Sequence, residues 1–313
     1  MTSPAPTHPI LVTGATGRHG ATGEHVVRRL REEGHAVRVL ARTLSERTDR
    51  LAELGAQVVV GDLQDRRTLV PALADVDLAY FTYPIAAGVI SAAANYAEAV
   101  REVGRHPRTV VMSMGPSHPE HLSDRGRDQW IAEQVLQWAG LDLNILRVTA
   151  AFHPNLAVLH GRSIRRDGVI RNSFGSGAVP WIGGDDAGEV GVAALLHPER
   201  FDATVSYVPG PEEFNHSQIA ALLTEVLGRP IRFEPITRDQ WRQDLVDLST
   251  IEGEDVVNPE MAGHISAVGQ TIDEKGPTRM ADAATLRRLI GRDPVLLRDY
   301  LQQNITLFQP ESN

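Results

Sequence analysis

Short apolar runs alternate with helical patterns along the first half of the chain. Each run is rich in β-branched residues, which is typical of a buried strand. In Glu24–Glu33, by contrast, Val26, Val27 and Leu30 recur at a spacing that places them on one face of a helix. The predicted strands are Ile10–Thr13, Val37–Ala41, Gln57–Val60, Leu78–Thr82, Thr109–Ser113 and Leu143–Arg147. Strands and helices in this alternation predict an α/β fold with a doubly wound parallel sheet, the Rossmann fold.

Glycines and capping residues set the expected ends of the helices. Gly34, Gly55, Gly104 and Gly140 each follow a helical pattern, where a left-handed C-cap favours glycine. The predicted helices are Glu24–Glu33, Leu44–Leu54, the segment after the N-cap Asp65, Ser91–Val103 and Gln129–Ala139.

The alternation stops after Arg147, which indicates a second domain. Asp185 and Asp186 precede a later helical pattern and are predicted to cap it. A strand predicted at Val205–Val208 is a candidate to return to the main sheet. The expected division is a flexible tail at 1–9, a cofactor-binding Rossmann domain at 10–154 and a smaller substrate-binding α/β lobe at 155–313.

Composition and charge narrow the functional classes. Forty acidic and 31 basic side chains give the 313 residues a net charge of −9, with no basic block, so we expect no nucleic-acid partner. The absence of cysteine excludes disulfides and thiolate catalysis. Leu78–Ala97 carries no charge, but Pro84 and Gly88 interrupt it, which predicts a strand, a loop and a helix rather than a membrane span. The start MTSPAPTHP lacks a signal-peptide pattern, so we expect a cytoplasmic protein.

The loop after the first strand carries the sequence GATGRHGATG. Gly14, Gly17 and Gly20 follow a strand and precede a helix, an arrangement that binds a dinucleotide pyrophosphate; the alternative is a merely tight turn. Because GATG occurs twice, the loop is three residues longer than needed, and the helix could be entered from Gly20 or from Gly23. The candidate contacts here are Gly14, Thr16, Gly17, Arg18, His19 and Gly20.

The residue after the second strand selects the cofactor. An acidic side chain there would bind the ribose of NAD, but this chain has Arg42, which favours the 2′-phosphate of NADP(H). Arg18 could add a second cation, and the alternative for Arg42 is a solvated strand-end arginine. Asp62 could accept from the adenine amino group or could cap a helix. Further candidate cofactor contacts after the third and fourth strands are Leu63, Thr82, Tyr83 and Pro84.

Several segments resemble the NmrA-like branch of the atypical short-chain dehydrogenases/reductases. They are ILVTGATG, VRVLART, VVVGDLQD, AYFTYP, GLDLNILRVTAAFHPN and GPEEFNHSQIAALLTEVLGRPIRFEPI. The resemblance implies an NADP-binding Rossmann domain with a small C-terminal substrate lobe. It also implies either an NAD(P)H-dependent reductase, often of quinones or enones, or a catalytically silent sensor of the cofactor's redox state.

The chain departs from the typical short-chain dehydrogenase at the Tyr-x-x-x-Lys dyad. Its one lysine, Lys275, lies in the wrong lobe. By register against Glu133, the tyrosine and lysine positions become Arg125 and Gln129. Gln129 could still hydrogen-bond a ribose, whereas Arg125 is too basic to give up a proton at neutral pH.

Other side chains are candidates for the proton donor and for the pocket. Tyr83, Ser113 and His153 follow strand ends, where ligands bind in such sheets, and are the catalytic candidates. Each has a structural alternative: Tyr83 could pack against the nicotinamide, Ser113 could close a strand-end turn and His153 could start a helix. Phe152, Trp181 and His153 are candidate substrate contacts, although large aromatic residues more often belong to a core. His118-Pro-Glu-His121 lacks an evident third ligand, so we expect no metal.

Three functions remain open at this point. The first is an NADPH-dependent reductase of a planar, apolar carbonyl compound, quinone, enone or imine. Such enzymes often act in secondary metabolism, and the protein could be a homodimer. The second is an NADP(H)-sensing regulator without turnover. The third is a non-redox dehydratase or cyclase on the same fold.

Overall fold

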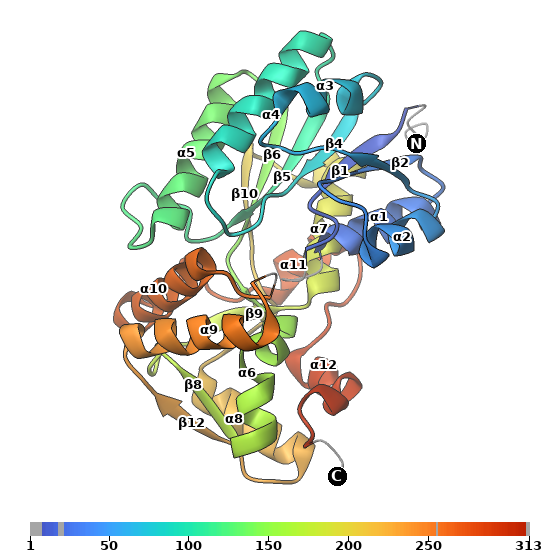
Figure 1. Ribbon diagram of the computed structural model, residues 1–313. Coiled ribbons are helices and arrows are strands. Elements are labelled where there is room, and N and C mark those ends of the chain that lie inside the picture. Colours follow the sequence, from blue (N-terminus) through green and yellow to red (C-terminus); the bar gives the residue numbers. More distant parts are fainter. Residues whose placement is uncertain (1–7, 18–21, 255, 311–313) are drawn as a thin grey trace.

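A seven-stranded parallel sheet forms the centre of the larger part of the protein (Figure 1). The structure is a computed structural model that describes residues 8–17, 22–254 and 256–310. The strand order is β3-β2-β1-β4-β5-β6-β10, which confirms the predicted doubly wound sheet. Its strands are β1 Ile10–Thr13, β2 Val37–Ala41, β3 Gln57–Val60, β4 Leu78–Phe81, β5 Arg108–Met114, β6 Leu143–Val148 and β10 Val205–Val208.

Two hydrophobic cores lie between this sheet and the helices that cover its two faces. Ile10 and Val12 of β1 pack into one core and Leu11 into the other, because side chains along a strand alternate between faces. The first core is covered by α1 Thr22–Glu32, α2 Glu46–Glu53, α7 Gly184–Leu196 and α11 Ala283–Ile290, and the second by α3 Arg66–Leu73, α4 Val89–Val103 and α5 Asp124–Trp138. Residues beyond 155 therefore supply two helices and one strand to the larger part.

The smaller part is built from short strands and the remaining helices. One sheet has the order β11-β9-β7, and β12 pairs with β8 in another. The strands are β7 Ala151–Phe152, β8 Val169–Asn172, β9 Val179–Ile182, β11 Glu212–Phe214 and β12 Arg232–Pro235. The helices are α6 His153–Asp167, α8 His216–Leu227, α9 Arg238–Glu252, α10 Pro259–Lys275 and α12 Leu297–Gln303, with the 3-10 turn η2 Ile305–Leu307. The 3-10 turn η1 Pro198–Arg200 packs on α7 in the larger part.

Four helix starts differ from prediction: α1, α2 and α4 begin two residues away, at Thr22, Glu46 and Val89. The start of α5 and the cap of α7 differ for reasons that the side chains show. Helix α5 begins at Asp124 rather than Gln129, because the Ser123 hydroxyl accepts a hydrogen bond from the Gly126 amide and caps it. The N-cap of α7 is Gly183, so the acidic pair does not cap that helix. Instead Asp185 pairs with His25, while the fully buried Asp186 accepts from the Val295 amide and pairs with Arg292.

Among the described residues, no helix has the length and apolar character needed to cross a bilayer. The uncharged stretch from Leu78 forms β4, a loop and the start of α4.

Candidate functional site

The glycine turn at the end of β1 is held by close backbone contacts. Gly14 has a φ of +68°, which favours glycine, and a Cβ there would come within 2.4 Å of the Thr82 Cγ2. A Cβ on Gly23 would come within 2.8 Å of the Ala15 Cα. Helix α1 therefore packs directly on the turn through Gly23, and the second GATG supplies the glycine at which the helix is entered.

The same turn leaves an open surface on the other side. A Cβ on Gly17 would meet only the Gly14 carbonyl oxygen, at 3.3 Å, among the atoms that the structure describes. The Thr16 carbonyl accepts a hydrogen bond from Arg47 at 2.9 Å. These two residues suit a backbone cradle for phosphate, in which N–H groups and a helix N-terminus face the anion. The other loop candidates, Arg18, His19 and Gly20, lie outside the described residues.

Arg42 is an exposed cation at the end of β2. Within residues 8–17, 22–254 and 256–310, neither a hydrogen bond nor an ion pair engages its guanidinium. Asp62 lies half-buried after β3, and its carboxylate accepts from the Gln64 amide at 2.9 Å. It does not cap α3, since that role belongs to Asp65. Leu63 is buried, and its carbonyl accepts from Asn95.

Tyr83 is tied into the loop after β4. Its hydroxyl donates to the Ala87 carbonyl at 3.0 Å and accepts from the Gln64 amide at 2.9 Å. Burial raises the pKa of the phenol, and the charges of Arg42 and Arg125 partly oppose that shift. The Tyr83 proton is thus committed to a loop carbonyl.

The neighbours of Tyr83 in sequence have backbone roles. The Thr82 carbonyl accepts a hydrogen bond from the Thr13 hydroxyl at 3.0 Å, and the Thr82 amide donates one to the oxygen of that hydroxyl. This pair of bonds joins the ends of β1 and β4. Pro84 is exposed and accepts from the Ala86 amide. Both residues therefore shape the edge of the sheet on which a cofactor would lie.

Ser113 belongs to a buried ionic network at the end of β5. Its hydroxyl donates to the Glu133 carboxylate at 2.5 Å, and Glu133 has no exposed surface. The Arg147 guanidinium contacts both carboxylate oxygens of Glu133 and donates to the Tyr207 hydroxyl at 3.0 Å. The Ser113 proton is therefore held by a carboxylate that already balances an arginine.

His153 is fully buried at the start of α6. No described residue hydrogen-bonds to either ring nitrogen, and the ring packs at a tilt against Tyr300, with ring centroids 5.4 Å apart. Burial lowers the pKa of His153 to about 4. Near neutral pH the imidazole is uncharged, so in this conformation it carries no extra proton to donate.

We expect the burial of His153 to appear in the pH dependence of stability. An unfolded chain takes up a proton on this residue as pH falls below 6.5, but the folded chain does so only near pH 4. The folded state should therefore lose about 1.4 kcal/mol per pH unit over that window from this residue. Urea unfolding of the wild type and of His153→Phe between pH 7 and 5 measures this effect. In the variant, the slope of the unfolding free energy against pH should be smaller by the equivalent of about one proton. An unchanged slope would contradict the buried, neutral imidazole.

The dyad positions lie in the first half of α5. Gln129 is buried, and its amide makes no hydrogen bond to any described residue, which leaves it available to a ribose. Arg125 lies one turn earlier on the same face, with its Nη2 2.8 Å from an Asp128 oxygen. Its Nη1 is buried without a partner.

The aromatic pocket candidates fall in different environments. Phe152 lies half-buried in β7, paired with Ile182 of β9 and packed on the first core. Trp181 is buried in the core of the smaller part, where its indole N–H donates to the Phe214 carbonyl at 3.3 Å and His216 packs against the ring. Trp181 thus packs in a core, the alternative that the sequence left open for it, and β9 is the central strand of its sheet.

A helical hairpin of α9 and α10 covers the loop after β4. Trp241 and Met261 form the hairpin core, and Ile85 of the β4 loop packs against it. The Asn258 amide donates to the Ile85 carbonyl at 3.2 Å, and His264 is hydrogen-bonded at 2.6 Å to Ser123. Sequence reasoning placed nothing from this hairpin near the site, because its contacts join residues more than 140 positions apart.

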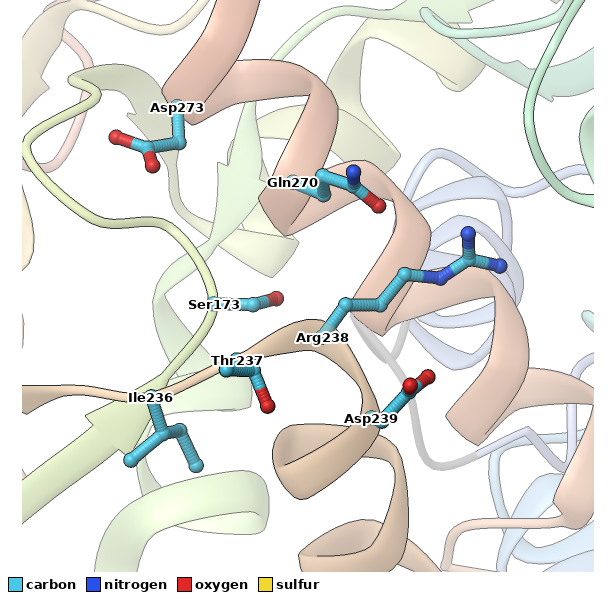
Figure 2. Close-up of a pocket in the computed structure, with 7 residues that line it drawn as sticks. All are labelled: Ser173, Ile236, Thr237, Arg238, Asp239, Gln270 and Asp273. Atoms are coloured by element: carbon cyan, nitrogen blue, oxygen red, sulfur yellow. The ribbon is translucent and has the colours of Figure 1, made fainter.

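A cavity of about 420 Å³ opens in the smaller part, at the start of α9 (Figure 2). Figure 2 shows Arg238 and Asp239 projecting from α9, with Gln270 and Asp273 on α10. None of the site residues predicted from the sequence lines it. Its lining residues are Ser173, Ile236, Thr237, Arg238, Asp239, Gln270 and Asp273.

The chain is similar to known proteins over nearly its full length. The profile of the NmrA-like family matches residues 6–279. An NAD(P)H azoreductase of Xenophilus azovorans is 30% identical over 78% of this chain and 82% of its own length. A (4-alkanoyl-5-oxo-2,5-dihydrofuran-3-yl)methyl phosphate reductase of Streptomyces griseus is 31% identical over 96% of this chain and all of its own. The structure of Citrobacter triphenylmethane reductase complexed with NADP(H) superposes with a TM-score of 0.76 at 20% identity, covering 94% of this chain and 99% of that one.

Proposed function

Because the chain belongs to the NmrA-like family, we propose that it is an NADPH-dependent reductase of planar, electron-poor acceptors such as quinones, enones, conjugated carbonyl compounds or imines. The observation that carries the proposal is a glycine turn open at Gly17, together with Arg42 at the end of the next strand, an exposed cation that no described residue engages. Two relatives with this family's fold are named as reductases, one of an azo compound and one of an unsaturated lactone phosphate.

The residues present fit NADPH. The Gly14–Gly17 turn and the start of α1 would hold the pyrophosphate, Arg42 the 2′-phosphate and Gln129 the nicotinamide ribose. When bound, the cofactor supplies the hydride. The loop after β4 and the hairpin of α9 and α10 would orient the acceptor and exclude water.

Among the described residues, none of the three candidate donors is placed to give a proton. The hydroxyls of Tyr83 and Ser113 donate to a carbonyl and to a carboxylate, and His153 is neutral near pH 7. We therefore propose that the reduced acceptor takes its proton from water. This restricts the substrates to acceptors that are electron-poor enough to accept hydride before protonation.

Cofactor binding tests the first part of this proposal. Arg42→Gln should weaken NADPH about tenfold or more, because a charge-assisted contact to the 2′-phosphate is lost, and should leave NADH within about twofold. Fluorescence titration of both nucleotides measures this. Arg101→Gln, an exposed arginine on α4, is the matched control and should change neither affinity. Equal weakening of both nucleotides by Arg42→Gln would refute its role in selection.

A further inference from the structure

Arg125 carries a guanidinium that the fold only partly satisfies. Asp128 takes its Nη2, whereas its Nη1 is buried and reaches no acceptor in the described part of the chain. Burying an N–H donor without an acceptor costs free energy, and folded proteins rarely leave such groups unpaired. The buried Nη1 therefore indicates that the missing acceptor belongs to a ligand.

The strand order places Arg125 away from the predicted adenosine half of the site. Arg42 follows β2, on one side of β1, and Arg125 lies on α5, between β5 and β6 on the other side. A dinucleotide lying across the strand ends with its adenosine near β2 would turn its nicotinamide toward Tyr83 and α5. Arg125 is close enough to Tyr83 for its charge to act on the phenol pKa. This places the guanidinium where an acceptor would bind.

We propose that Arg125 binds an anionic substituent of the acceptor, of the sulfonate, carboxylate or phosphate class. The proposal rests on the proposed reductase function and specifies its substrate. A guanidinium binds such oxygens with charge-assisted, often bidentate hydrogen bonds, and a buried one discriminates strongly between an anion and a neutral group. Gln129, which would hold the nicotinamide ribose, lies one turn along the same face of α5.

Matched quinones test this assignment. The probes are 1,4-naphthoquinone-2-sulfonate and the neutral 2-methyl-1,4-naphthoquinone, titrated by calorimetry into protein saturated with NADP⁺. Arg125→Gln should weaken binding of the sulfonate about tenfold or more and change the neutral quinone far less. Arg125→Lys, which keeps the charge but loses the planar fork, should fall between the wild type and the glutamine variant.

Two control variants separate ligand binding from a structural role. If Arg125 only holds Asp128, Asp128→Asn should reproduce the effect of Arg125→Gln; the proposal expects no weakening, because the guanidinium remains. Arg101→Gln, also from an ion pair within one helix turn, should have no effect. Equal weakening of both quinones, an Asp128→Asn effect like that of Arg125→Gln, or weakened NADPH with unchanged sulfonate would each overturn the assignment.

A separate assay, in which each quinone is added to the protein with NADPH and the NADPH absorbance is followed, distinguishes failure of the two proposals. Sulfonate selectivity that depends on Arg125, without NADPH oxidation by either quinone, would refute the reductase function and leave the anion site standing. NADPH oxidation by both quinones, without an effect of Arg125→Gln on sulfonate binding, would refute the anion site and leave the reductase function standing.

Discussion

Gly14→Ala should weaken NADPH binding at least tenfold and destabilise the fold by about 2–4 kcal/mol. The methyl group would lie 2.4 Å from the Thr82 Cγ2 and 3.1 Å from the Thr82 carbonyl oxygen, while φ stays at +68°. Thr82 cannot simply move away, because its backbone bonds to Thr13 join β1 to β4. Overpacking and left-handed strain each cost about 1–3 kcal/mol.

Gly104→Ala isolates the effect of crowding. Gly104 has nearly the same φ, +70°, but a Cβ there meets nothing within 4 Å. This variant should lose only about 1 kcal/mol and keep its NADPH affinity. Urea unfolding and fluorescence titration of the two variants measure both effects. Equal losses in both would show that strain, not the close approach of two strands, makes Gly14 necessary.

Glu133→Ala should destabilise the protein by about 3–5 kcal/mol. It leaves the Arg147 guanidinium without its carboxylate inside the protein and removes the acceptor of Ser113. Glu98→Ala, which breaks an exposed pair with Arg101, should cost less than about 1 kcal/mol.

A double variant shows whether the cost comes from the unpaired charge. Glu133→Leu combined with Arg147→Met removes both charges and should lose clearly less than the two single variants together. Additive losses in urea unfolding would mean that the two side chains act independently, contrary to their contact in the structure.

Local patterns predicted the strands well and the site less completely. The residues of β1 and β2 could be read from apolar runs between turn signals, since a parallel strand buried on both faces typically has a continuous apolar run. The start of α5 could not, because Gly126 and four charged residues precede the apolar pattern. Gly126 is required by a close side-chain contact: a Cβ there would lie 2.4 Å from the His121 ring.

The chemistry of the candidate donors depends on contacts that local patterns do not contain. Ser113 was predicted to follow a strand end but lies within the last residues of β5. Its partner Glu133 lies 20 residues later, and the sequence alone gave no sign of that contact. The glycine loop was more informative, because its spacing is a local property. The sequence left two entries to the helix open, and the contact of Gly23 with Ala15 identifies the second.

Hydride transfer itself is the most direct test of the account. The protein would be incubated with NADPH deuterated at the transferable position of the nicotinamide and with 1,4-naphthoquinone-2-sulfonate, while NADPH absorbance is followed. The account predicts that NADPH is oxidised only when the protein is present. The deuterated cofactor should react more slowly, in the steady state or in the first turnover, because hydride leaves the bound cofactor. Arg42→Gln should lower the rate at limiting NADPH. Tight NADPH binding without oxidation by this quinone, its neutral analogue or a conjugated enone would contradict the account and favour a cofactor sensor.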